Sequence, residues 1–288
     1  MKPTGTNQGA EHPARVTFNL EAIDEIARKG IRRAAVFMGL GVNAAGSAEL
    51  RDYHLNQDTT LHLLPASVSP KVLQDWKDQF RLWVVSSGFR EVIDSLCRYF
   101  DKIHLGCSIV ASKRLDKRAQ QCFERLGLDR KIDALSSKLG ITSPNAELVS
   151  SFYPIRNCLV HRLGRVGHED VRNGTALTLR YRRIELVHTA ESGRVTRLPD
   201  LMNPNAEGFR TEEAGSLGLQ YPERCLEFPL GTIVTFSPKE LTEILFFTHH
   251  FLFEYNRAVL DFAQRHGAYR PPASNLAPAD LGAPPTEN

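Results

Sequence analysis

The segment SFYPIRNCLVHRLGRV spans residues 151–166 and carries both an apolar stripe and a cluster of polar groups. Large apolar side chains recur every three or four residues here, beginning just before the segment, and this spacing places them on one face of an α-helix. They are Leu148, Phe152, Ile155, Leu159 and Leu163. Ser143-Pro144 is expected to open this helix and Gly164 to end it. Pro154 lacks the backbone N–H that a helix interior needs, so it marks either a kink or a second helix start.

The chain before this segment is also predicted to be helical. Residues 20–38 have a one-sided apolar pattern, and the overlapping apolar run Ala34–Val42 is compatible with helix or strand. Gly39-Leu40-Gly41 lacks the spacing of a dinucleotide-binding loop and is interpreted as a turn. Ser69-Pro70 suits the start of a strong helix, because Ser caps the first N–H groups and Pro needs no helical partner there.

Apolar residues then repeat at helical spacing as far as Ile103, although Ser86-Ser87-Gly88 could bend or interrupt the pattern. A further helix is expected over residues 115–139, with a possible break at Gly127 and a C-terminal stop at Gly140. These segments together predict a mainly α fold in which long helices precede the motif helix.

The character of the chain changes after the motif. Thr175–His188, Arg194–Leu198 and Leu226–Phe236 are rich in alternating and β-branched residues, which predicts a small antiparallel β insertion before the last helix. Ser237 and Glu240 then form the pattern of a capping box at the start of that helix. Its segment Leu241–Phe262 is apolar on nearly every face, so we expect burial from a second side, by the β element or by another subunit.

We expect three parts: an N-terminal extension over 1–65 that is partly disordered, a helical domain over 66–267 with its β-rich insertion at about 170–236, and a disordered Pro/Ala-rich tail over 268–288. The five cysteines show no CxxC spacing, and no apolar stretch approaches the ~20 residues needed to span a bilayer. A cytoplasmic protein that does not enter a membrane is therefore expected.

Charge is distributed unevenly, although the net charge is only +3. Residues 151–210 contain ten arginines and no lysine against six acidic residues, whereas residues 211–288 contain five basic and ten acidic residues. Guanidinium groups suit phosphate because they can donate two parallel hydrogen bonds. The pattern fits a phosphate-binding face around the motif, or equally a solvated arginine-rich surface.

The motif itself, Arg156-Asn157-Cys158-Leu159-Val160-His161, resembles the Arg-x4-6-His signature of the HEPN superfamily, in the form with Asn directly after Arg. The resemblance covers about residues 69–164 and 237–266, and leaves 1–65 unexplained. The segment between the motif helix and the last helix is longer than in the simplest members, and Pro154 is a further departure.

The resemblance implies an HEPN-like helical bundle and a metal-independent endoribonuclease whose catalytic residues are Arg156, Asn157 and His161. It also suggests a role in toxin–antitoxin systems or defence, with an antitoxin or regulatory protein as a possible partner. Other members are non-catalytic scaffolds that bind a nucleotide, RNA or a partner protein, which is the alternative function here. Arg162 and Arg165 are expected to bind RNA, and no cofactor or metal is expected.

The residue types fit this chemistry independently. RNA supplies its own nucleophile, the 2′-OH, a histidine can serve as acid or base near neutral pH, and an arginine can stabilise the phosphorane charge. Arg156 lies about 140° around the helix axis from His161, which favours a composite cleft formed by a homodimer. Two other interpretations stay open: His161 could interact with the carbonyl end of its helix, and Arg156 could form a structural ion pair.

Overall fold

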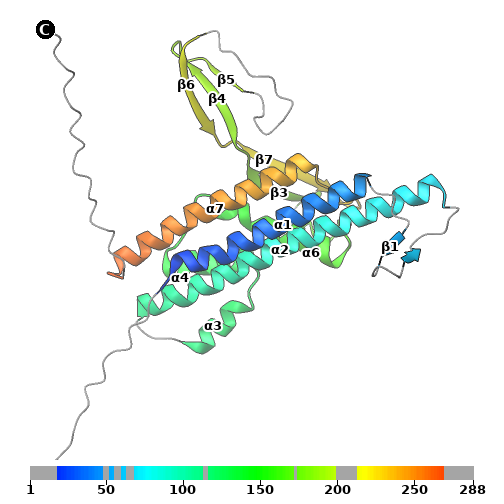
Figure 1. Cartoon of the computed structure of the whole chain (residues 1–288). Coiled ribbons are helices and arrows are strands. Elements are labelled where there is room, and N and C mark those ends of the chain that lie inside the picture. Colours follow the sequence, from blue (N-terminus) through cyan, green and yellow to red (C-terminus); the bar gives the residue numbers. More distant parts are fainter. Residues whose placement is uncertain are drawn as a thin grey trace, which may run out of the picture.

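The protein is mainly helical, with a small antiparallel β element between its last two helices (Figure 1). The computed structural model describes residues 18–47, 52–54, 60–62, 68–112, 116–171, 174–198 and 213–268. The helices are α1 (Leu20–Ser47), α2 (Pro70–Ser112), α3 (Lys117–Glu124), α4 (Leu128–Leu139), α5 (Ala146–Ser150), α6 (Phe152–His161) and α7 (Pro238–Arg265). Residues 1–17 and 269–288, which fall within the segments expected to be partly or wholly disordered (1–65 and 268–288), lie outside the described residues.

Helices α1 and α2 lie side by side and approach closely at glycines (Figure 1). A Cβ on Gly41 of α1 would lie 2.6 Å from Val84 Cγ1, and a Cβ on Gly88 of α2 would lie 2.2 Å from Met38 Cγ. The interpretation of residues 39–41 as a turn is therefore wrong, because both glycines are inside α1. Residues 86–88 do not interrupt α2, and Gly88 lies where Met38 of α1 packs.

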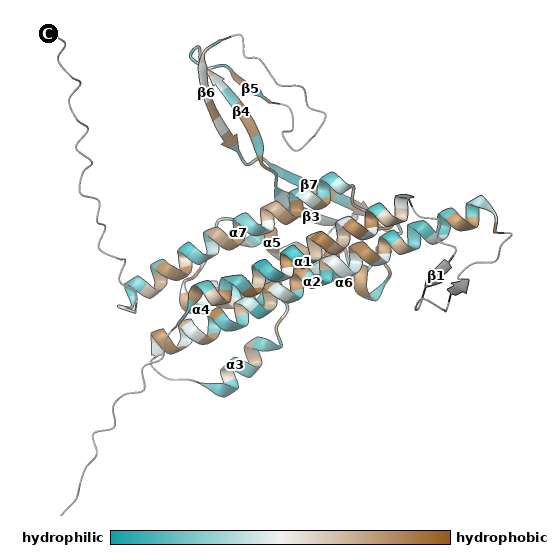
Figure 2. Ribbon diagram, in the orientation of Figure 1, coloured by the Kyte–Doolittle hydropathy of each residue, from teal (hydrophilic) through white to brown (hydrophobic). Residues whose placement is uncertain are grey.

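The core is continuous across α1, α2, α4, α6 and α7. Figure 2 shows hydrophobic and hydrophilic residues alternating along α1, α2 and α7. Helix α1 contributes Ala27, Ile31, Ala34 and Met38 to this core. Residues 20–47 thus belong to the helical body rather than to an extension outside it. No helix within the described ranges is both long and apolar enough to cross a membrane.

Local sequence signals set the ends of the short helices that precede the motif. Gly127 separates α3 from α4, and Gly140 ends α4 with a left-handed φ of 64°. Helix α5 begins after Asn145 rather than at Ser143-Pro144. A turn at Ser151 separates α5 from α6, so Pro154 lies in the first turn of a second helix, where its missing N–H costs no helical hydrogen bond.

The β element consists of a two-stranded and a three-stranded antiparallel sheet. Strand β3 pairs with β7, while β4 lies between β5 and β6 and forms an arm that projects from the helices (Figure 1). The strands are β3 (Ala176–Arg182), β4 (Glu185–Ala190), β5 (Val195–Arg197), β6 (Gly215–Gln220) and β7 (Glu223–Pro229). A further pair, β1 (Asp52–His54) with β2 (Thr60–His62), joins α1 to α2 and was not predicted.

Helix α7 begins with the predicted capping box, in which Ser237 Oγ accepts from Glu240 N and Glu240 Oε2 accepts from Ser237 N. It packs on α1, α2 and β3, which explains its many apolar faces. Tyr181 of β3 donates a hydrogen bond to Glu243 of α7 at 2.9 Å. The β element therefore provides a second side of burial within one chain, one of the two sources expected from the sequence.

Candidate active site

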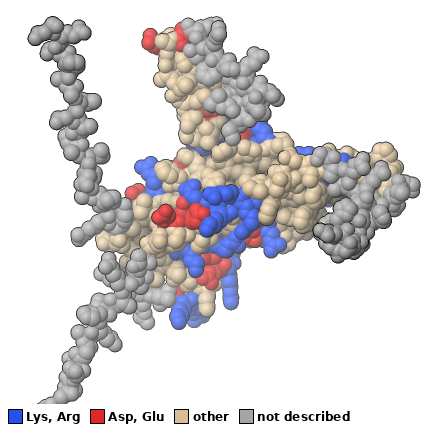
Figure 3. All heavy atoms as spheres, viewed as in Figure 1, with Lys and Arg blue, Asp and Glu red and all other residues tan. Residues whose placement is uncertain are grey.

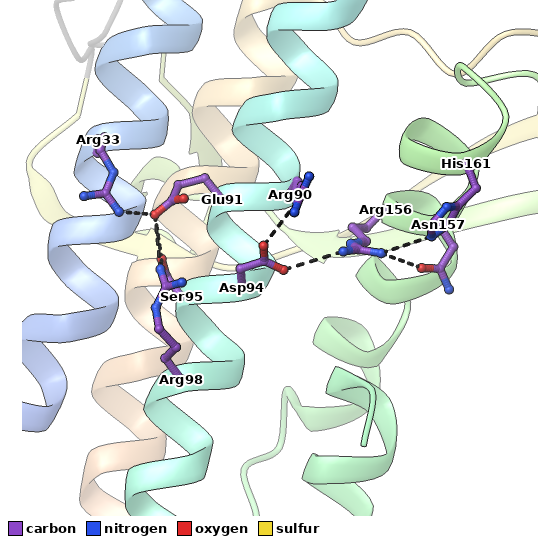
Figure 4. Close-up of polar contacts among 9 residues, drawn as sticks. All are labelled: Arg33, Arg90, Glu91, Asp94, Ser95, Arg98, Arg156, Asn157 and His161. Carbon is purple, nitrogen blue, oxygen red and sulfur yellow. Dashed lines mark hydrogen bonds and ion pairs between the residues drawn. The ribbon is translucent and has the colours of Figure 1, made fainter. Parts of the chain in front are cut away.

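Arg156 projects from α6 between Asp94 of α2 and the other two motif residues (Figure 4). Its Nη1 donates to Asn157 Oδ1 at 3.2 Å and lies 3.4 Å from His161 Nε2. Its Nη2 lies 3.7 Å from Asp94 Oδ1. The side chain is only 17% exposed, whereas His161 is exposed. The three predicted catalytic residues therefore meet within a single chain.

This contact corrects the geometric argument for two copies of the helix. The helical angle between Arg156 and His161 was expected to keep their functional groups apart, yet the two side chains are in contact. The arginine side chain is long, and His161 is the last residue of α6, where no further helical turn stands in the way. A composite cleft is therefore not needed to bring arginine and histidine together.

The ion-pair interpretation of Arg156 holds in part. Asp94 is 34% exposed and also accepts from Arg90 Nε at 3.3 Å, so the carboxylate lies between two guanidinium groups. His161, by contrast, reaches Arg156 through Nε2. The same guanidinium thus contacts an acid–base group on one side and a carboxylate on the other.

A cavity of about 370 Å³ adjoins these groups. It is lined by residues of α6 and of the turn that follows: Tyr153, Pro154, Arg156, Asn157, His161, Arg162, Glu169 and Asp170. The volume falls in the range of roughly 300–1,000 Å³ typical of small-molecule sites. The cavity can thus hold a nucleotide-sized group against both Arg156 and His161.

The two arginines expected to bind RNA have other partners. Arg162 forms a two-point ion pair with the buried Asp170, with Nε donating to Oδ2 at 2.8 Å. That contact, first among several, raises the pKa of Arg162 above its usual value. Arg165 donates to the Gly231 carbonyl at 3.0 Å and does not line the cavity. Of these two arginines, only Arg162 lines the cavity, and Asp170 neutralises its charge.

Much of the arginine excess around the motif is neutralised in the same way. Arg180 pairs with Glu147 and Glu223, and Glu185 pairs with Arg183 and Arg197. Figure 3 shows cationic and anionic side chains interleaved over the middle of the helical body. The fold therefore uses many of these guanidinium groups to join its β strands and helices, which fits the solvated-surface interpretation better than an open phosphate-binding face.

Cys158 lies inside the motif but is unsuited to nucleophilic chemistry. It is fully buried, and burial raises the pKa of its thiol to about 11. Because the thiolate is the reactive form, Cys158 is a poor nucleophile, which leaves His161 as the candidate acid–base group of the motif. Within the described ranges, no three His, Cys, Asp or Glu side chains are close enough together to hold a metal ion.

Sequence reasoning did not assign five residues to the site, namely Asp94 and the cavity-lining Tyr153, Pro154, Glu169 and Asp170. Asp94 has an arginine four residues before it on α2, which matches any solvated helix face. Glu169 is in a turn with no pattern of its own. No local signal in the sequence distinguishes these residues from other surface groups.

Comparison with known proteins adds no further assignment. No protein-family model, curated protein or solved structure matches the chain, so the geometry and chemistry of the site carry the functional argument.

Proposed function

We propose that this protein is a metal-independent endoribonuclease with an HEPN-like helical bundle. The observation that carries the proposal is the 3.4 Å approach of Arg156 Nη1 to the exposed His161 Nε2 at the edge of a nucleotide-sized cavity. An acid–base group and a fixed cation beside one cavity are what phosphodiester transfer to an internal hydroxyl requires.

In the proposed reaction, the RNA 2′-oxygen attacks the adjacent phosphorus, and its proton passes to a base. The bond from phosphorus to the 5′-oxygen then breaks, and that oxygen takes up a proton. His161 carries one of these protons, and Arg156 stabilises the charge of the phosphorane. Asn157 holds the arginine in place through the 3.2 Å hydrogen bond. The products are a 2′,3′-cyclic phosphate and a 5′-hydroxyl.

The proposed working unit is a homodimer. Each chain offers one motif histidine, whereas the reaction needs both a base and an acid. Large apolar side chains also stand exposed on α1, on α2 and just after the motif: Val36, Phe37, Leu40, Trp83 and Leu163. A two-fold interface that covers such side chains would bring two motifs to one cleft.

The first experiment incubates the purified protein with RNA in EDTA. We expect cleavage that leaves 2′,3′-cyclic phosphate ends, with DNA intact because it lacks the 2′-OH. His161→Ala should lose about 10²- to 10⁴-fold in rate, while His266→Ala, at the far end of α7, is the matched control and should cleave normally. Cleavage that disappears in EDTA and returns with magnesium would exclude the proposal.

Mixing two inactive variants tests the composite site. If each cleft uses Arg156 from one chain and His161 from the other, a mixed dimer of Arg156→Ala and His161→Ala contains one intact cleft and regains activity. If each cleft needs Arg156 and His161 from both chains, or if the two residues act together within one chain, mixing restores no activity. Light scattering then separates these cases, because a fully active monomer excludes the dimeric site.

The second candidate function is a non-catalytic scaffold that binds a nucleotide, RNA or a regulatory partner such as an antitoxin. The observation that favours it is the pairing of Arg156 with Asp94, in a side chain that is only 17% exposed. A scaffold should bind single-stranded RNA or nucleotide without cutting it. Binding that survives His161→Ala, together with no cleavage by the wild-type protein, would support this function.

A further inference from the structure

The cavity beside the motif is acidic on one wall, which phosphate binding does not require. Glu169 and Asp170 line the same cavity as Arg156 and His161. The two carboxylates differ in environment. The Asp170 side chain is 2% exposed and bound to Arg162 and to the Gly167 N–H at 2.9 Å, whereas that of Glu169 is 60% exposed.

Arg162 holds the Glu169 carboxylate at a defined place. Its Nη1 lies 3.3 Å from Glu169 Oε1, while its other nitrogens are bound to the buried Asp170. The Glu169 carboxylate also lies close to the backbone of Gly167, where a Cβ would lie 2.6 Å from Glu169 Oε2. The arginine predicted to bind RNA is thus a positioning residue for a carboxylate.

We propose that this wall is a guanine subsite, in which Glu169 accepts hydrogen bonds from the Watson–Crick edge of a base next to the scissile phosphate. The inference rests on the proposed ribonuclease function. Guanine presents two adjacent, parallel donors, N1–H and N2–H, and a carboxylate can accept both at once. Uracil offers one N–H between two carbonyl oxygens, which a carboxylate repels, and adenine and cytosine offer only an amino group.

The remaining wall suits a flat ring. Tyr153 and Pro154 line the same cavity, and aromatic side chains in ribonucleases and other RNA-binding proteins stack on unpaired bases. The Tyr153 ring lies close to Gly127, where a Cβ would lie 2.6 Å from its Cζ. Stacking and a bidentate edge contact together select a single-stranded purine with donors at N1 and N2.

The test uses oligonucleotides that are 2′-O-methylated except at one ribonucleotide, so that cleavage can occur at one phosphate only. The bases on both sides of that phosphate are varied in turn among the four, with inosine as a fifth because it lacks the N2 amino group. We expect one flanking position to favour guanine over adenine by roughly 5- to 150-fold, with inosine between them.

Glu169→Gln should bring the guanine-to-adenine ratio close to one, because an amide presents only one acceptor oxygen. Glu169→Asp, which retracts the carboxylate, should lower the ratio as well and provides a second variant if the first is unstable. Glu227→Gln on the exposed face of β7 is the matched control and should keep the wild-type ratio.

The outcomes separate the two proposals. Cleavage of total RNA without a preference for guanine at either flank overturns the guanine subsite and leaves the ribonuclease intact. A guanine preference that persists in both Glu169 variants also overturns it. Failure to cut any RNA, total or synthetic, overturns the ribonuclease and the subsite together.

Discussion

The close packing of α1 on α2 can be tested with the same substitution at two positions of one helix. Gly39 and Gly41 both lie in α1. A Cβ on Gly39 would meet nothing within 4 Å, whereas a Cβ on Gly41 would lie 2.6 and 2.7 Å from the two methyl carbons of Val84. Gly39→Ala and Gly41→Ala should therefore change stability in opposite directions.

The magnitudes follow from two competing effects. Alanine in place of glycine inside a helix stabilises it by about 1 kcal/mol, because the unfolded chain loses less conformational freedom. Gly39→Ala should gain most of this stabilisation, because its new methyl meets no neighbouring atom. At Gly41 the new methyl would lie about 1 Å inside the normal contact distance of ~3.5–4.0 Å, and overpacking costs about 1–3 kcal/mol. Val84 is buried and stiff at χ1, so the overpacking should exceed the gain, with a net loss of up to about 2 kcal/mol.

Urea unfolding followed by circular dichroism measures both variants against the wild-type protein. We expect a higher midpoint for Gly39→Ala, a lower one for Gly41→Ala and the same m value for all three, since the surface exposed on unfolding is unchanged. Equal effects at the two positions would refute the helix packing. A loss of stability in Gly39→Ala would favour a turn at residues 39–41.

Three further predictions concern the site and its frame. Asp94→Asn should lower turnover by about 10- to 100-fold with little change in RNA affinity, because Arg156 loses the carboxylate that positions it; faster turnover would mean that Asp94 restrains the arginine. Ser237→Ala should cost about 1 kcal/mol in the free energy of unfolding through the lost cap of α7, and an unchanged urea midpoint would contradict it. In the native protein, iodoacetamide should modify the exposed Cys122 long before Cys158, because burial raises the pKa of the Cys158 thiol to about 11. Mass spectrometry of the labelled peptides measures both rates, and equal labelling would contradict the burial of Cys158 on α6.

Much of the secondary structure was predictable because its causes are local. The capping box at Ser237, the left-handed stop at Gly140 and the second helix start before Pro154 all depend on residues within one helical turn. The antiparallel β element before the last helix followed from alternating side chains. The motif residues Arg156, Asn157 and His161 could be selected for the same reason, since they lie within six consecutive positions.

The errors have a different cause, namely tertiary contacts that no local sequence pattern reveals. Gly41 lies inside α1, and Val84 of α2 packs where its side chain would be; no local pattern reveals that neighbour. The charge of Arg162 is neutralised by Asp170, and that of Arg156 is shared with Asp94. A count of arginines gives the charge a segment carries, but the packing of helices and turns decides which of those charges remain available to a substrate.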